Sequence, residues 1–119
     1  MADRKAATDL ELTGEERQAL LRIARESIEA GLKGEPPPAA GGKGKLDEKR
    51  GAFVSLKKRG KLRGCIGMIE ARKPLARTVE EMAAAAAFQD PRFPPLRKEE
   101  LKDLRVEISV LTPLRRVAD

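Results

Sequence analysis

The stretch that decides the fold is GAFVSLKKRGKLRGCIGMI, which spans residues 51–69. Apolar and polar residues alternate over residues 51–57, a pattern typical of a strand with one buried face. Residues 58–61 form the turn, and Gly60 can take the positive φ that a tight turn often needs. Residues 62–69 then return as a second strand. The stretch therefore predicts an antiparallel hairpin.

An amphipathic helix precedes the hairpin in the sequence. Thr13 and Glu16 match a capping box, in which each residue bonds the other's backbone at the start of a helix. Apolar residues recur at helical spacing up to residue 32, with charged residues on the other side. Gly31 and Gly34 are typical of a helix end. The pattern predicts a helix over about 14–32.

A second helix and a third strand follow the hairpin. Pro74 suits a first helical turn, and the alanine run at 83–87 favours a helix that lies close to a sheet. The proline-rich segment 90–95 predicts a stiff loop, with a short helix at about 96–102. Residues 104–112 alternate as a strand should. The fold class is therefore α+β, with an antiparallel sheet, made of the hairpin and this later strand, packed by two main helices.

Two segments fall outside this regular structure. Residues 1–12 are expected to be a flexible lead-in, and the Pro/Gly-rich segment 35–45 is expected to be a surface linker within a domain at 13–119. No signal peptide or membrane-spanning run is visible, so we expect a cytoplasmic protein without membrane contact. With one cysteine and no histidine, we expect no zinc site, and the sequence points to no cofactor.

Positive charge gathers in one part of the chain, whose net charge is +6 overall. Residues 43–63 hold nine basic and two acidic residues and so carry +7. Such a run usually lies on a solvated surface. It could also attract nucleic acid or an acidic protein. The basic residues are Lys43, Lys45, Lys49, Arg50, Lys57, Lys58, Arg59, Lys61 and Arg63.

The returning strand carries the residues that could do chemistry. In regular strand geometry Arg63 and Cys65 share one face, and Leu62, Gly64 and Ile66 take the other. A guanidinium beside a thiol favours the thiolate, a nucleophile or redox group. The flanking glycines predict either backbone open to a ligand or close packing. The alternative is a small cysteine buried between strand and helix. Without histidine, the chain has no Cys–His pair.

The proline-rich loop supplies a second candidate set. Asp90 and Arg92 sit on a stiff segment that could form one wall of a binding site. The alternative is a turn that ends the helix and holds a local ion pair.

Four motifs occur in one order along the chain: residues 51–56, 62–67, 90–95 and 106–113. In these motifs the chain resembles the AMMECR domain family, and it is similar to the members called AmmeMemoRadiSam system protein A. The resemblance implies a two-lobed α+β fold around an antiparallel sheet. It also implies association with a Memo-like protein and a radical S-adenosylmethionine enzyme, although it supplies no reaction. Relative to that family the C-terminal portion is missing, so an incomplete domain is expected.

Carried onto this sequence, the resemblance marks seven residues. We expect Cys65 and Arg63 in a catalytic role, and a substrate-binding role for Gly64, Gly67, Asp90, Arg92 and Phe93. The first hypothesis is a component of a modification system linked to the radical enzyme, with a cleft around Leu62–Gly67. The alternative is a non-catalytic binding module that contacts nucleic acid or an acidic protein through residues 43–63. The third hypothesis is that the chain is truncated and has no function of its own.

Overall fold

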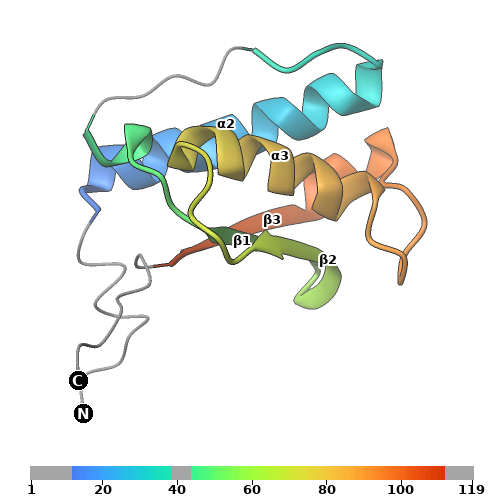
Figure 1. Cartoon of the computed structure of the whole chain (residues 1–119). Coiled ribbons are helices and arrows are strands. Elements are labelled where there is room, and N and C mark those ends of the chain that lie inside the picture. Colours follow the sequence, from blue (N-terminus) through green and yellow to red (C-terminus); the bar gives the residue numbers. More distant parts are fainter. Residues whose placement is uncertain (1–11, 39–43, 112–119) are drawn as a thin grey trace, which may run out of the picture.

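The computed structural model describes residues 12–38 and 44–111. Two α-helices lie along one side of a small sheet (Figure 1). None of the described helices is long and apolar enough to cross a membrane. The elements, with η1 and η2 as short 3-10 helices, are α2 (Gly14–Lys33), η1 (Gly44–Asp47), β1 (Ala52–Lys58), β2 (Lys61–Met68), α3 (Leu75–Phe88), η2 (Lys98–Asp103) and β3 (Leu104–Val110).

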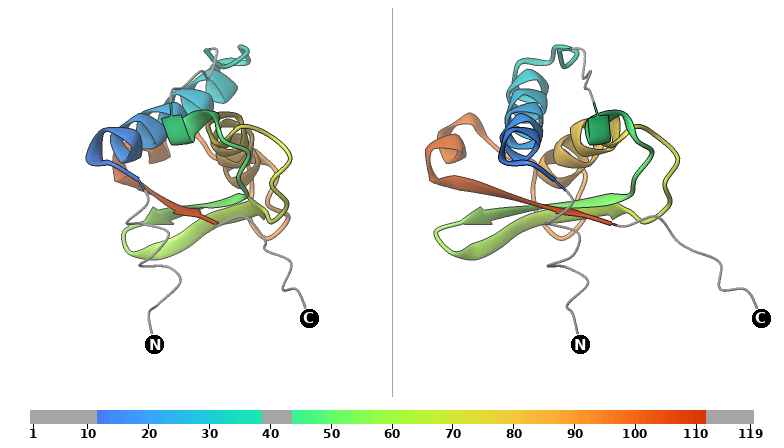
Figure 2. Two further views of the ribbon diagram at one scale, coloured as in Figure 1. Left: turned by 60° about the vertical axis from the view of Figure 1, so that its left-hand side comes forward. Right: turned by 90° about the vertical axis from the view of Figure 1, so that its left-hand side faces the viewer.

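The sheet has the strand order β2-β1-β3, and both pairings are antiparallel. Val54 of the central strand lies opposite Ile66 on one side and Ile108 on the other. Both α-helices cover the face to which these side chains point (Figure 2). The predicted α+β arrangement is confirmed. The prediction of which β3 side chains point inward is also confirmed. These residues belong to the core or pack against it: Leu104, Val106, Ile108 and Val110.

The helix α2 begins as its sequence predicts. The Thr13 N–H donates to Glu16 Oε1 at 2.9 Å, and the Glu16 N–H donates to Thr13 Oγ1 at 3.0 Å. It ends at Gly34, whose φ of 70° lies in the left-handed region. Gly31 lies in the last turn, where its carbonyl accepts the Gly34 N–H at 3.2 Å, and it has a second role. A Cβ there would lie 2.4 Å from the ring of Phe88, so this glycine lets α2 and α3 approach closely.

The expected boundaries shift in three places. Leu12, placed in the lead-in, is buried in the core, while residues 1–11 lie outside the described part of the chain. Of the expected linker, residues 35–38 have no regular structure and residues 39–43 are not described, but η1 takes up the last two positions. There Leu46 reaches the core and anchors the turn. The expected short helix near residue 96 is the 3-10 helix η2.

The other face of the sheet has no helix of the described chain packed on it (Figure 2). We call it the open face. The strand register assigns to it the residues that alternate with the core set. They are Phe53, Ser55 and Lys57 on β1, Leu62, Cys65 and Gly67 on β2, and Arg105, Glu107 and Ser109 on β3.

Candidate functional site around Cys65

A β-bulge in β2 separates the two residues that were expected to act together. Leu56 lies opposite Gly64, and its neighbour Lys57 lies opposite Leu62, so Arg63 is an extra residue without an opposite partner. A bulge interrupts the alternation of faces along its strand. Leu62, and not Arg63, therefore shares the open face with Cys65. The expectation that Arg63 and Cys65 point the same way was wrong, because it assumed a regular strand.

Arg63 instead fastens the sheet to η2. Its side chain is only 10% exposed. Its Nε donates to Glu100 Oε1 at 2.8 Å, and its Nη2 donates to Glu100 Oε2 at 3.1 Å and to the Pro94 carbonyl at 2.9 Å. Two-point bonding of a guanidinium to a carboxylate is a strong, directional contact. Its charge is thus balanced by Glu100 and is not aimed at the thiol.

Glu100 is a site residue that sequence reasoning missed. It also accepts a hydrogen bond from Lys58 Nζ at 3.1 Å. The hydrogen bonds from Arg63, more than any other influence, lower the pKa of Glu100 to about 2. It lies 37 positions from Arg63 on a polar helical turn. No local pattern distinguishes it from its exposed neighbour Glu99, so only the tertiary fold identifies it.

The backbone of Cys65 is held on its outer side by the proline-rich loop. The Cys65 N–H donates to Asp90 Oδ2 at 3.0 Å, and the Cys65 carbonyl accepts from Arg92 Nη2 at 3.4 Å. These are the two backbone groups that a further strand would bond at this edge. Side chains of the loop thus take the place of a neighbouring strand at this one position.

Asp90 and Arg92 form a tight pair around that contact. Arg92 Nε and Nη2 donate to the two Asp90 carboxylate oxygens at 3.0 and 2.7 Å. The Asp90 side chain is buried, and the Arg92 side chain is more than half exposed. The bonds from Arg92, followed by the Cys65 N–H, hold the pKa of Asp90 far below its usual range. Both expected residues are therefore at Cys65, as an ion pair that positions its backbone.

The Cys65 sulfur projects from the open face and is half-buried. Its Sγ lies 3.2 Å from Ser55 Oγ, directly across on β1, and either group could be the donor. The thiol is therefore neither enclosed in the aliphatic core nor fully in solvent.

Phe93 lies between the two arginines of this region. The guanidinium carbons of Arg63 and Arg92 are 5.8 and 5.5 Å from the centre of its ring. Both distances are within the range of cation–π attraction. The ring therefore links the loop to the bulge, and the structure brings Phe93 to the same strand edge as Asp90 and Cys65.

The two glycines of the motif are closely packed on their Cβ side. A Cβ on Gly64 would lie 2.2 Å from the Ala86 carbonyl oxygen of α3. A Cβ on Gly67 would lie 2.2 Å from the ring of Phe53. Both spaces are filled by protein atoms. The close-packing interpretation is confirmed at both glycines, and a substrate-binding role for Gly64 and Gly67 stays a prediction.

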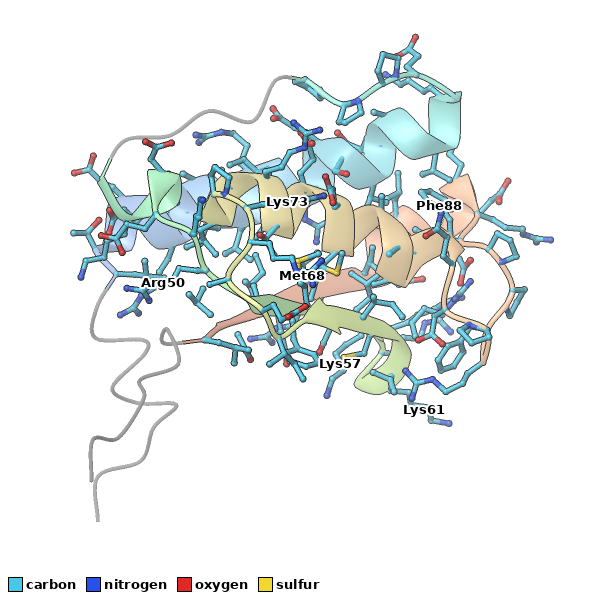
Figure 3. The ribbon with its side chains drawn as sticks, in the orientation of Figure 1. Arg50, Lys57, Lys61, Met68, Lys73 and Phe88 are labelled. Atoms are coloured by element: carbon cyan, nitrogen blue, oxygen red, sulfur yellow. The ribbon has the colours of Figure 1, made fainter. Side chains whose placement is uncertain are left out.

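The basic run does not form one uniform positive surface in the described residues. Lys58 and Arg63 bond Glu100, and Arg59 Nη2 lies 3.3 Å from Asp103 Oδ2. Lys57 and Lys61 extend from the hairpin on the side away from the helices (Figure 3). Acidic residues of η2, distant in sequence, therefore pair with three of the nine basic residues in the local count.

A hollow of the described surface lies away from Cys65. It has a volume of about 670 Å³ and opens between the start of α2 and η1, with Glu16, Arg22 and Leu46 among its walls. None of the Cys65 site residues lines it. The described part of the chain holds no cluster of three or more Cys, Asp or Glu side chains arranged for a metal ion.

Comparisons with known proteins place this architecture in a family. The AMMECR1 family model matches residues 21–119. A protein of Methanothermobacter thermautotrophicus is 46% identical over 109 residues, which cover 86% of this chain and 54% of that protein. Protein MK0488 of Methanopyrus kandleri is 46% identical over 113 residues, with 89% and 53% covered.

A solved structure supports the same family assignment. The crystal structure of the uncharacterized protein PH0010 from Pyrococcus horikoshii superposes with a TM-score of 0.73 at 40% identity, covering 79% of this chain and 50% of that one. The chain thus spans about half the length of the relatives it matches. The family model covers most of the chain and the solved structure shares its fold, and on this evidence the chain belongs to the AMMECR1 family.

Proposed function

We propose that this chain presents Cys65 as a ligand-contacting thiol on the open face of the sheet. The setting we propose is a modification system that includes a Memo-like protein and a radical S-adenosylmethionine enzyme. The partners rest on the family resemblance. The location rests on the geometry around Cys65.

One observation carries the proposal. The main chain of Cys65 is clamped on its outer side by Asp90 and Arg92, while its sulfur projects toward Ser55 on a face that no described helix covers. A group held by a rigid backbone and left partly accessible suits precise contact with a ligand. A cysteine that only filled space would sit on the helix side, where Val54 and Leu56 are fully buried.

The roles within the site are revised accordingly. Cys65 remains the proposed reactive or binding group. Arg63 becomes a positioning residue, because Glu100 and Pro94 engage it. The Ser55 hydroxyl can donate a hydrogen bond to a thiolate, and Arg92 is the cation nearest the Cys65 backbone.

The chain's single cysteine allows a direct test by alkylation. Iodoacetamide should modify folded Cys65 several-fold faster than it modifies N-acetylcysteine at the same pH. Ser55→Ala should slow the reaction, because it removes the hydroxyl beside the sulfur. Ser109→Ala, on the same face but on β3, is the matched control and should leave the rate unchanged. A rate no higher than that of N-acetylcysteine would contradict an activated thiol.

The proposed partners need a separate measurement. The chain, a Memo-like protein and a radical S-adenosylmethionine enzyme from one genome would be purified and mixed in pairs, with binding followed by calorimetry. We expect binding that Cys65→Ala weakens while the circular dichroism spectrum stays unchanged. Absence of binding in every pair would remove this setting and leave the thiol result untouched.

A non-catalytic binding module remains the second candidate. The observation in its favour is the pair Lys57 and Lys61, which point away from the helices (Figure 3). Balanced charges at Lys58 and Arg59 weigh against it. Fluorescence anisotropy with labelled RNA and DNA at low salt tests it, since phosphate contacts give salt-dependent binding. Binding lost in Lys57→Glu would support it.

A further inference from the structure

The Arg92 guanidinium is held beside Cys65 by contacts with three residues. Its Nε and Nη2 bond the Asp90 carboxylate, and Nη2 also donates to the Cys65 carbonyl at 3.4 Å. The ring of Phe93 lies 5.5 Å from the guanidinium carbon. A cation held in this way is preorganised for a ligand, because its side chain has already lost its freedom on folding.

This cation lies within electrostatic reach of the Cys65 sulfur. Hydrogen bonds to Asp90 are the largest cause that raises the pKa of Arg92 above its usual value, and the charge of the Cys65 thiolate adds to the rise. A molecule that approaches the sulfur therefore also approaches the guanidinium.

The ion pair has its positive end on the outer side. The Asp90 side chain is 2% exposed, whereas the Arg92 side chain is 56% exposed among the described residues. A ligand thus meets the guanidinium before it meets the carboxylate. The contacts with Asp90 and Cys65 use Nε and Nη2, and a guanidinium offers five N–H donors. Arg92 can therefore bind a second carboxylate while it keeps the first.

The ion pairs of this strand edge have an excess of positive charge. Three cations, Lys58, Arg63 and Arg92, share two carboxylates, Asp90 and Glu100. Both carboxylates are largely buried, and Arg63 Nη1 has no hydrogen-bond partner among the described residues. The surroundings of Cys65 therefore favour an anionic ligand over a neutral or cationic one.

We propose that the ligand of Cys65 is a small molecule with a carboxylate next to the atom that meets the sulfur, and that Arg92 binds this carboxylate. The inference rests on the proposed function, because it names a ligand class for the same thiol. A guanidinium binds a carboxylate through two parallel hydrogen bonds, which give direction as well as attraction. Arg92 would select the charge of the ligand and orient it, and Cys65 would supply the contact.

Two alkylating reagents of nearly the same shape test the proposal on the full chain. Iodoacetate carries a carboxylate where iodoacetamide carries a neutral amide, and the thiolate displaces iodide from both. The measured quantity is the charge ratio, which is the rate constant for iodoacetate divided by that for iodoacetamide. At low salt we expect the charge ratio of Cys65 to be roughly five-fold above that of N-acetylcysteinamide, the effect of one charge pair at short distance in water.

The charge ratio is independent of how reactive the thiol is, because both reagents meet the same sulfur. A slow reaction with both reagents would contradict the activated thiol, while the charge ratio would still decide the ligand class. The two ideas can therefore fail separately.

Two double variants and salt locate the cause. Asp90→Asn/Arg92→Gln neutralises the pair without changing the net charge, and should lower the charge ratio to that of N-acetylcysteinamide. Arg97→Gln/Glu99→Gln neutralises an exposed pair, is the matched control and should leave the charge ratio unchanged. Sodium chloride at about 1 M shortens the Debye length to about 3 Å and should lower the charge ratio of the native chain.

Three results would overturn the proposal. One is a native charge ratio no higher than that of N-acetylcysteinamide at low salt. Another is a raised charge ratio that salt does not lower. The third is an equal decrease in the two double variants, because the cause is then a diffuse field and not Arg92. Circular dichroism checks the folding of each variant, and the first two results need only the native chain.

Discussion

The two edge strands of the sheet, β2 and β3, differ in the side chains that bond their outer backbone groups. At β2, the loop after α3 supplies Asp90 and Arg92 to the outward backbone of Cys65, and Arg63 is locked to Glu100. At β3, the guanidinium of Arg25 on Leu104 is the one side-chain bond to the edge backbone found in the described residues. The β2 edge is held at Cys65 by an ion pair with a buried carboxylate, and the β3 edge is held at Leu104 by one exposed arginine.

This difference between the edges shows how side-chain contacts can fix the geometry of a short edge strand. Buried ion pairs and a bulge fix β2 in one geometry, which suits a strand that carries a candidate functional thiol. On β3, Arg105 and Glu107 stay exposed, and among the described side chains Arg25 alone bonds the outer backbone. Substitutions at Gly64, Glu100 and Arg25 should show how strongly each edge depends on its contacts.

The largest effect is expected where β2 meets α3. Gly64→Ala would drive a methyl group into the Ala86 carbonyl, which is backbone and cannot move aside cheaply. We expect a loss of about 3 kcal/mol or more in the free energy of unfolding, the upper range for overpacking. Urea denaturation measures it. Gly14→Ala is the matched control, because nothing lies within 4 Å of its added Cβ. Equal effects from both would contradict the close contact.

Removing the charge of Glu100 should come next. Glu100→Gln leaves the buried Arg63 guanidinium without its counter-charge, and we expect a loss of about 2 kcal/mol. Glu99→Gln, at the exposed neighbouring position, should change the free energy of unfolding by less than about 0.5 kcal/mol. A comparable loss in both variants would show that the pair with Arg63 does not hold the β2 edge.

The same pair predicts a pH dependence. The pKa of Glu100 in the folded chain is about 2, below the ordinary 4.5, so the folded state favours the carboxylate. Its contribution is therefore fully present above about pH 5 and is lost as the pH falls toward 2. Chemical denaturation across this range should show a shallower decline for Glu100→Gln than for the native chain. An identical decline in both would contradict the assignment, since the remaining slope then belongs to Asp90 and other carboxylates.

The smallest effect is expected at the β3 edge. Arg25→Gln removes the bond to the Leu104 carbonyl, and a single partly buried hydrogen bond contributes about 1 kcal/mol. Arg22→Gln, another exposed position on the same helix, is the control and should be close to neutral. A loss from Arg25→Gln as large as that from Glu100→Gln would show that β3 is closed as firmly as β2, and would end the contrast between the edges.

Most residues of the candidate site could be predicted from the sequence, but their ion-pair and hydrogen-bond partners could not. The motif order brought Cys65, Asp90, Arg92 and Phe93 to attention, and the structure gathers all four at one strand edge. The face of Arg63 was mistaken, because a one-residue bulge leaves no mark in local alternation. Glu100 was missed because its partner lies far away in sequence.

By itself the sequence determined the elements of this protein. Periodicity and capping residues fix α2 and the strands, since local sterics and one-sided burial act over a few residues. The tertiary structure alone decided which charges pair, which glycine spaces are filled and which side chains bond each edge strand. Those outcomes depend on atoms brought together from distant positions, where hydrogen-bond geometry and packing, and not local pattern, set the energy.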